Sequence, residues 1–177
     1  MVTALGEQEF RELMAGVCAP VTVVTATADG VPYGTTVSAF ASLSLRPPMV
    51  TVALDRHSRL LPHVTAAGRF GVNVLGHTQG DVALEFARRG AVDRFAEVSW
   101  HLDHGLPRLD AAPGWLACDL TSVVEGGDHL LLLGTVTHAR ATAAAPLVYG
   151  YRAFGTHSAY VRRPRTSIGE QVAACTR

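Results

Sequence analysis

Lysine is missing from this chain, and all 15 of its basic residues are arginine. This absence excludes Schiff-base chemistry on a lysine amine and the phosphate-binding lysine of P-loop proteins. The formal net charge is zero, because 15 acidic residues balance the arginines. A chain without net positive charge is not expected to bind nucleic acid or an anionic membrane as a partner.

Cysteine is scarce as well. The three cysteines, Cys18, Cys118 and Cys175, are far apart, so neither a zinc ribbon nor a disulfide framework is indicated. We expect Cys18 and Cys118 to be small buried hydrophobic residues. No apolar run approaches the ~20 residues of a membrane span. Residues 1–10 lack the basic-then-apolar layout of a signal peptide. These absences predict a soluble cytoplasmic protein.

The common nucleotide-binding and hydrolase motifs are also absent. The sequence contains no GxGxxG, GxxxxGK[ST], GxSxG or HExxH pattern, which counts against Rossmann, P-loop, serine-hydrolase and zincin functions. His101 and His104 invite a metal interpretation, but no third ligand follows at a sensible spacing. We therefore expect two surface histidines and no metal site.

What is present is a globular chain rich in strand-forming residues. Its 177 residues are 48% hydrophobic and 17% charged, which fits one folded domain. The Asp29-Gly30 turn between two β-branched runs predicts a hairpin. Strands are predicted at residues 21–25, 31–37, 49–54, 70–75, 116–124, 130–139 and 147–151, and short helices at 7–17, 58–68 and 82–89. Residues 38–46 are expected to be non-helical, and residues 91–113 irregular with Phe95 and Trp100 as packing anchors.

This order of elements lacks the alternation of strands and helices that a parallel doubly wound sheet requires. We therefore predict a mainly β fold, an antiparallel β-barrel with a few short helices. The predicted domain spans residues 1–161, and residues 162–177 form a C-terminal tail.

A run of hydroxyl side chains is the first candidate for a binding site. It extends from Thr36 to Pro48 with hydroxyls at positions 36, 38, 42 and 44. In an extended segment, positions of equal parity point the same way. Hydroxyls and free backbone N–H groups in a row can hold an anionic or amide-rich ligand. The alternative is a Ser/Thr-rich loop that bonds only to itself and to water.

Two further segments are candidates for ligand contacts. Asp55 to Arg59 joins the end of a strand to the start of a predicted helix, where Arg56 or Arg59 could bind a phosphate. Gly126 to His129 forms a turn before an apolar strand, so the imidazole lies at the edge of a buried sheet. There it can contact a phosphate or a carboxamide. A solvated helix start and an incidental hairpin turn remain the respective alternatives.

Together these segments resemble the flavin reductase-like family, the small reductase partners of two-component monooxygenases. The resemblance implies that the antiparallel β-barrel is a split β-barrel that binds flavin. The family pattern T-x-S-x-x-S-x-S-x-x-PP matches Thr36–Pro48, and its D-x-x-S matches Asp55–Ser58. The other matches are Phe70–Leu75 to F-x-V-N-x-L, Ala87–Phe95 to the stretch before an R/K-F pair, Gly127–His129 to G-D-H, and Pro146–Tyr149 to P-L-x-Y. Their common order along residues 8–157 is what makes the resemblance specific.

The resemblance implies a homodimeric NAD(P)H-dependent flavin reductase that binds FMN or FAD, receives NADH or NADPH near His129, and supplies reduced flavin to a separate monooxygenase. Lysines that bind phosphate in many relatives must be replaced here by Arg56, Arg59, Arg89 or Arg94. The site residues implied are Thr36, Val37, Ser38, Ala39, Ser42, Ser44, Ala53, Leu54, Asp55, Ser58, Arg59, Arg89, Phe95, Asp128, His129 and Tyr149. His129 is the expected catalytic group, in the sense of positioning the nicotinamide.

Two other functions remain open at this point. The chain could be a split-barrel oxidase that keeps a tightly bound FMN and acts on a small substrate. It could also be a non-catalytic flavin-binding module. The G-D-H turn argues against the oxidase.

Overall fold

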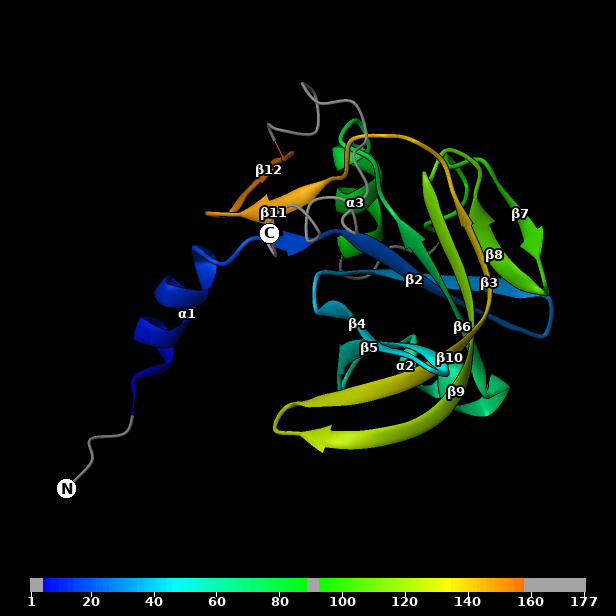
Figure 1. Cartoon of the computed structure of the whole chain (residues 1–177), viewed down its shortest axis with the longest axis horizontal. Coiled ribbons are helices and arrows are strands. Elements are labelled where there is room, and N and C mark those ends of the chain that lie inside the picture. The colour runs from blue at the N-terminus through cyan, green and yellow to red at the C-terminus, as the bar shows by residue number, and fades with distance from the viewer. Residues whose placement is uncertain (1–4, 89–92, 158–177) are drawn as a thin grey trace, which may run out of the picture.

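The computed structural model describes residues 5–88 and 93–157. Over these residues the chain forms three helices and twelve strands (Figure 1). The helices are α1 Glu7–Ala15, α2 Leu61–Ala67 and α3 Gly80–Ala87. The strands are β1 Ala19–Pro20, β2 Thr22–Ala28, β3 Val31–Val37, β4 Phe40–Leu45, β5 Pro48–Asp55, β6 Arg69–Val74, β7 Trp100–Asp103, β8 Leu106–Leu109, β9 Gly114–Gly126, β10 His129–Ala141, β11 Val148–Gly150 and β12 Ala153–Gly155.

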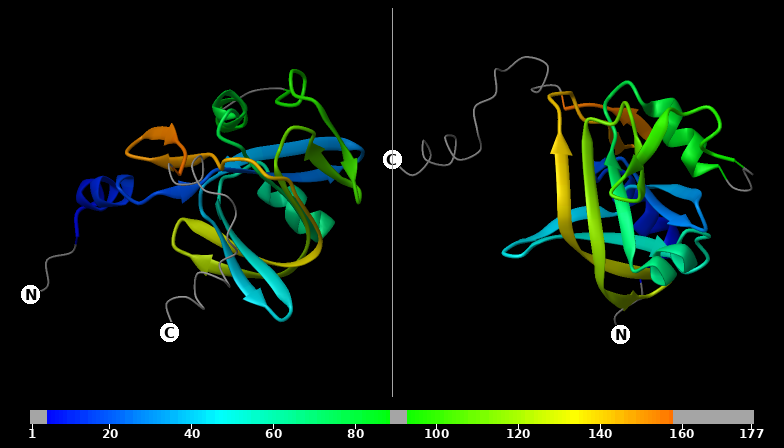
Figure 2. Two further views of the ribbon diagram at one scale, coloured as in Figure 1. Left: turned by 45° about the horizontal axis from the view of Figure 1, so that its top comes forward. Right: turned by 90° about the vertical axis from the view of Figure 1, so that its right-hand side faces the viewer.

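One strongly curved sheet dominates the molecule. Seven strands follow the order β3-β2-β6-β9-β10-β5-β4, and each pair is antiparallel. The edge strands β3 and β4 are joined through Ser38 and Ala39, where the N–H of Phe40 donates to Ser38 O at 2.9 Å. The sheet therefore curls until its two edges approach each other (Figure 2). This confirms the predicted antiparallel β architecture, in the form of a barrel left open between its edges.

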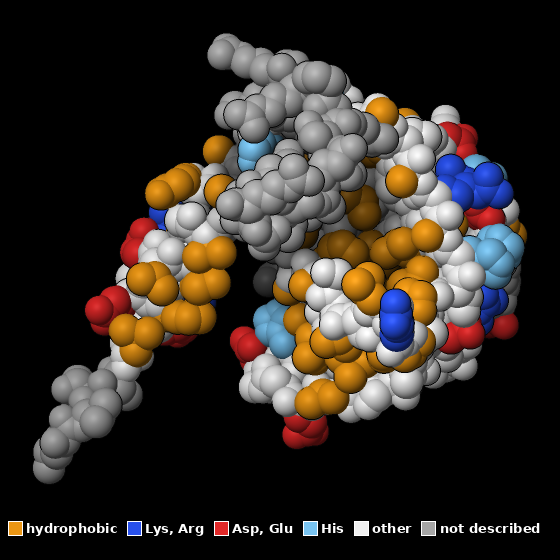
Figure 3. Space-filling model, viewed as in Figure 1, with side chains coloured by type: hydrophobic (Ala, Val, Ile, Leu, Met, Phe, Trp, Pro, Cys, Tyr) orange, Lys and Arg blue, Asp and Glu red, His pale blue; other side chains and the backbone are white. Residues whose placement is uncertain are grey.

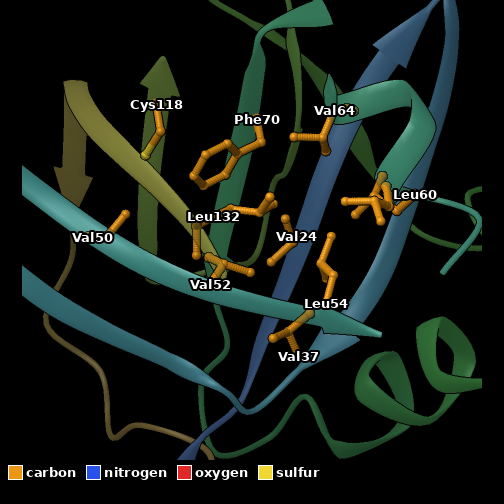
Figure 4. Packing of buried hydrophobic residues seen from close by; sticks show 13 residues of the cluster. Val24, Val37, Val50, Val52, Leu54, Leu60, Val64, Phe70, Cys118 and Leu132 are labelled. Carbon is orange, nitrogen blue, oxygen red and sulfur yellow. The ribbon is translucent and has the colours of Figure 1, made fainter. Parts of the chain in front are cut away.

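The main core lies inside this curve. Along β5, Val50, Val52 and Leu54 are buried at alternate positions, as the two-residue period of a strand requires. They pack beside Leu132 of the neighbouring strand β10 and against Phe70 of β6 (Figure 4). A second cluster, including Phe86, Phe95 and Leu109, packs beneath α3. Burial of these two clusters specifies the register of the strands. The register in turn determines which residues of neighbouring strands lie opposite each other where the strands end.

Several local predictions need correction. Residues 91–113 are not irregular throughout, because β7 and β8 form a small hairpin that pairs only with itself. Pro107 within β8 hid this strand from pattern analysis. The segment after Ser38, predicted only to be non-helical, forms the edge strand β4, and β12 follows the strand predicted to be the last.

The two cysteines expected to be buried differ. Burial raises the pKa of the Cys118 thiol to about 12, which makes it chemically inert. Cys18 is exposed, because it precedes the short strand β1 outside the main sheet.

Helix α1 stands apart from the curved sheet (Figure 1). Within the described chain it buries none of its residues. It is attached at its C-terminal end, where the N–H of Tyr151 donates to Ala15 O at 2.5 Å and Arg152 binds Glu12 at 2.7 Å. Apolar side chains are exposed on this segment, on β4 and near the end of β9 (Figure 3): Phe10, Leu13, Met14, Val17, Leu43, Leu45, Val123 and Val124.

Two predictions reach beyond the described residues. The domain boundary at residue 161 and the tail at 162–177 both lie outside them. Among the helices that are described, none has the length and apolar character needed to cross a bilayer.

Candidate functional site

A cavity of about 1240 Å³ opens between the edge strand β3, the end of β5, α2 and the loop after α3. This volume exceeds the ~300–1,000 Å³ usual for a single drug-sized ligand. Parts of all three candidate segments line it: Thr36 to Ala39, Asp55 with His57 to Arg59, and His129. Segments separated by up to about ninety positions in sequence therefore share one cavity.

Strand pairing explains this convergence. In the β5–β10 ladder, Asp55 lies opposite His129 and Ala53 lies opposite Leu131. Ala53 also donates its N–H to Ala39 O at 2.9 Å, which joins the β3–β4 connection to the same ladder. The ends of three chain segments are thus held together by main-chain hydrogen bonds, which do not depend on flexible side chains.

The hydroxyl run does not form one continuous wall. Thr36, Val37, Ser38 and Ala39 line the cavity, but Ser42 and Ser44 lie on β4 outside it. The chain turns at residues 38–39, and the β4–β5 pairing shifts register between Ser42 and Ser44, so equal parity no longer means a common direction. The Thr36 hydroxyl donates to Ala83 O of α3 at 2.6 Å, so part of its bonding capacity serves the fold.

Two arginines bring cationic groups to the cavity, which Asp55 and Asp93 also line. Arg59 and Arg94 both line it. Arg94 donates to Gly34 O at 2.7 Å and to Arg88 O at 2.5 Å, while its Nε is buried without a partner among the described residues. Burial, and secondarily the like charge of Arg59, lower the pKa of Arg94. Two guanidinium groups in this relation favour a bound anion such as a phosphate.

The other predicted phosphate ligands are placed differently. Arg56 does not line the cavity, because its guanidinium binds Gly127 O at 2.8 Å and lies 3.5 Å from Glu125. Arg89 lies outside the described residues. Arg59 and Arg94 are therefore the two candidates that the described structure brings to the cavity.

His129 contributes an imidazole at the mouth of the cavity, with 43% of its side chain exposed. Its Nδ1 lies 2.8 Å from Asp128 Oδ1. The hydrogen bond to His129 holds the pKa of the Asp128 carboxyl below its usual range. The carboxylate fixes the ring and leaves Nε2 as the nitrogen available to a ligand.

The loop at the start of α2 is organised around Asp55 and Ser58. Asp55 Oδ1 accepts the N–H of His57 at 2.7 Å, and its carbonyl accepts the N–H of Ser58 at 2.8 Å. The Ser58 hydroxyl accepts the N–H of Leu60 at 3.4 Å. Asp55 and Ser58 both line the cavity, together with Ala53 and Leu54 from β5.

Aromatic rings form much of the remaining wall. Tyr33 stacks on His63 with ring centroids 3.6 Å apart, and Phe95 meets Trp100 edge to face at 5.3 Å. All four line the cavity. Sequence reasoning included Phe95 but missed Tyr33, His63 and Trp100 as site residues. Tyr33 precedes the hydroxyl run on the same strand, whereas nothing in the sequence linked His63 to it.

Two groups of predicted or considered residues lie away from the cavity. Tyr149 sits on β11, where it pairs with Ala19 and packs against Phe154. His101 binds Asp110 at 2.5 Å, while His104 stacks on His138, so these two histidines do not converge. In the described ranges, no group of three or more His, Cys, Asp or Glu side chains is arranged to hold a metal.

Comparisons with known proteins show the family to which the chain is similar. The flavin reductase like domain matches residues 14–158. The chain is 41% identical over 152 residues to the reductase component of the 4-nitrophenol 4-monooxygenase/4-nitrocatechol 2-monooxygenase of Rhodococcus opacus, covering 85% of this chain and 81% of that protein. It is also 41% identical over 159 residues to the NADH:riboflavin 5'-phosphate oxidoreductase of Streptomyces pristinaespiralis, covering 86% and 89%.

A solved structure extends the likeness to three dimensions. The NADH:FAD oxidoreductase of Streptomyces globisporus, in complex with NAD and FAD fragments, matches with a TM-score of 0.83 at 30% identity. The match covers 89% of this chain and 96% of that one.

Proposed function

Because this chain belongs to the flavin reductase-like family, we propose that it is an NADH- or NADPH-dependent flavin reductase of the cytoplasm that supplies reduced FMN or FAD to a separate monooxygenase. The observation that carries the proposal is the single cavity shared by Thr36–Ala39, Asp55 with His57–Arg59, and His129. The proposed domain remains residues 1–161 with a tail at 162–177.

The cavity suits a flavin nucleotide in both charge and size. Arg59 and Arg94 are the residues that would hold its phosphate, and the volume leaves room for a second, flat ligand. Ser38 and the Ala53–Asp55 segment offer further polar groups along the cavity. When bound, the flavin supplies the redox chemistry, which is acceptance of a hydride from a reduced nicotinamide.

The protein's own residues orient the reactants and limit water. Phe95 and Trp100 cover one side of the cavity with apolar surface. His129, with Asp128 fixing its ring, offers Nε2 to the nicotinamide amide group. Direct hydride transfer needs no proton donor at the reacting carbon, so His129 acts by positioning. The rate then depends mainly on how rigidly these walls are held.

A steady-state assay tests this function. Purified protein is mixed with each pairing of FMN or FAD with NADH or NADPH, and nicotinamide oxidation is followed by absorbance. We expect turnover only when flavin is added, with a rate that follows the added flavin. Oxidation that fails with both flavins and both nicotinamides contradicts the proposal. A yellow protein that survives gel filtration without consuming nicotinamide favours the oxidase instead.

We also propose that a second copy of the chain covers α1. A helix of nine residues is too short to be stable alone in water, and none of its residues is buried within the described chain. Its apolar residues, such as Leu13, which is 68% exposed, need a partner surface. A symmetric homodimer supplies one, and it also covers the exposed apolar residues of β4.

Light scattering after gel filtration checks the dimer. Leu13→Glu should convert it to a monomer, while Glu9→Gln, on the same exposed helix, should leave it a dimer. A wild-type chain that elutes as a monomer at micromolar concentration contradicts this assembly.

A further inference from the structure

The turn that precedes His129 is hydrogen-bonded to one arginine, Arg56. Between β9 and β10 the chain reverses through Gly127, which has φ 69°. The Arg56 guanidinium donates from Nε to Gly127 O at 2.8 Å. The backbone N–H of Arg56 donates to Asp128 O at 3.0 Å. Two consecutive carbonyls of the turn are therefore held by a single residue.

Arg56 is also part of the loop that forms the opposite wall. It follows Asp55, which pairs with His129 across the sheet, and precedes His57, Ser58 and Arg59, which line the cavity. Its guanidinium lies 3.5 Å from Glu125, at the other side of the turn. The residue thus connects the phosphate side of the cavity to the His129 side without lining the cavity itself.

The His129 ring is linked to Arg56 through Asp128. Asp128 contacts the ring at Nδ1 at 2.8 Å, and 91% of its side chain is exposed. Asp128 belongs to the turn, and Arg56 binds the carbonyl oxygens of both Gly127 and Asp128. A guanidinium can bind a carbonyl and a carboxylate at once because its donors are rigidly spaced, whereas a lysine ammonium cannot match this geometry.

We propose that Arg56 is a positioning residue that holds the Gly127–Asp128 turn, and through it the His129 ring, at a fixed place relative to the loop of residues 55–59. This inference rests on the proposed function, in which His129 receives the nicotinamide. It assigns Arg56 to the alignment of nicotinamide with flavin and removes it from the set of phosphate ligands. A small misplacement of reactants is costly in rate, so loss of Arg56 should affect nicotinamide use selectively.

The chain provides a matched control in Arg69. Its Nε binds Asp119 at 2.9 Å and its Nη1 donates to His104 O, also a hairpin-turn carbonyl, at 3.2 Å. The exposed fraction of its side chain is 40%, against 38% for Arg56. The two arginines have similar partners and exposure, but the turn held by Arg69 lies outside the cavity.

The experiment compares Arg56→Met, Arg56→Lys and Arg69→Met with the wild type. We expect Arg56→Met to lower kcat/KM for NADH about fivefold, mainly through KM, with flavin affinity from fluorescence quenching changed less than about twofold. Arg56→Lys should fall between the wild type and Arg56→Met. Arg69→Met should leave both quantities unchanged.

Hydrogen exchange gives a readout that does not need activity. Amide exchange in residues 126–129 should be faster in Arg56→Met and unchanged in Arg69→Met. If Arg56→Met folds poorly, the same comparison is made with Arg56→Lys.

The outcomes separate this proposal from the proposed function. A wild type that oxidises neither nicotinamide with any flavin defeats the proposed function. An active wild type, together with unchanged NADH kinetics in Arg56→Met or an equal loss in Arg69→Met, overturns the positioning role. Flavin binding weakened as much as NADH use makes Arg56 a flavin ligand and likewise overturns it. Amide hydrogen exchange at residues 126–129 that is unchanged in Arg56→Met also overturns the positioning role.

Discussion

Two hairpin turns of this protein carry the same dipeptide and use it differently. Asp103 and His104 lie at the β7–β8 turn, whereas Asp128 and His129 lie at the β9–β10 turn. In each turn an arginine donates to a backbone carbonyl. The His104 ring stacks on His138 at 3.4 Å, away from the cavity, while His129 lines the cavity.

The two carboxylates show what the difference means. Asp103 is 11% exposed and binds Arg108 at 2.8 Å, with Arg140 at 3.5 Å. Asp128 is 91% exposed and binds the neighbouring imidazole. We expect the carboxylate enclosed by cations to stabilise the fold, and the exposed carboxylate that orients one ring to serve the proposed site. The dipeptide alone cannot distinguish these roles, because its surroundings decide them.

The largest effect should come from the histidine at the cavity. We expect His129→Ala to lower kcat/KM for NADH about tenfold, because one oriented hydrogen-bonding group is lost. Flavin affinity should stay within about twofold. The measurement is NADH oxidation at saturating flavin, with His104→Ala as the control that keeps wild-type kinetics. If the rate of His129→Ala is unchanged, His129 has no part in the mechanism, and the functional difference between the two turns is contradicted.

The next effect concerns stability. Asp103→Asn should lower the free energy of unfolding by about 1 kcal/mol, because the guanidinium of Arg108 loses its charged partner in a largely enclosed position. Asp128→Asn should leave the urea midpoint unchanged. Equal destabilisation by the two substitutions contradicts the division into a structural and a functional turn.

The fold was predictable where local signals agreed. The strand at residues 31–37 matches β3 in full, because the Asp29-Gly30 turn fixes its start and both turn residues adopt positive φ. The β7–β8 hairpin was missed because its strands are short and one contains Pro107. The exposure of Cys18 and of α1 depends on which surfaces remain uncovered, and no local pattern records that.

The candidate site was predictable as separate segments but not as one cavity. Their convergence depends on β10 lying beside β5 with His129 opposite Asp55, a register that the whole curved sheet determines. The same folding separates Ser42 and Ser44 from Thr36 and turns Arg56 toward Gly127. The resemblance to a family linked these segments to one function, but only the three-dimensional structure distinguishes an arginine that lines the cavity from one that binds a turn.

A smaller kinetic effect should follow from Asp128. Asp128→Asn keeps an oxygen that can accept the Nδ1–H of His129 but loses the charge. We expect kcat/KM for NADH to fall about threefold, less than in His129→Ala, because an exposed pair contributes little. Asp103→Asn serves as the comparison, with wild-type NADH kinetics in the folded protein. A loss as large as that of His129→Ala means that the negative charge itself acts on the nicotinamide.

The smallest effect is expected in acid. The hydrogen bond from Arg108 holds the pKa of Asp103 below its ordinary value of about 4. In the unfolded chain Asp103 keeps its ordinary pKa, so on acidification the unfolded chain binds the proton before the folded protein does. The stabilisation by Asp103 is therefore complete near neutrality, and it is lost as the pH falls toward the lower pKa of the folded protein. Unfolding by urea between pH 6 and pH 3 should therefore show a smaller loss of unfolding free energy in Asp103→Asn than in the wild type.

The pKa of Asp128 is also lowered, by His129, but exposure to solvent screens this interaction. Asp128→Asn should therefore show the same dependence of unfolding free energy on pH as the wild type. If that dependence is weaker in Asp128→Asn than in Asp103→Asn, the roles assigned to the two turns are reversed.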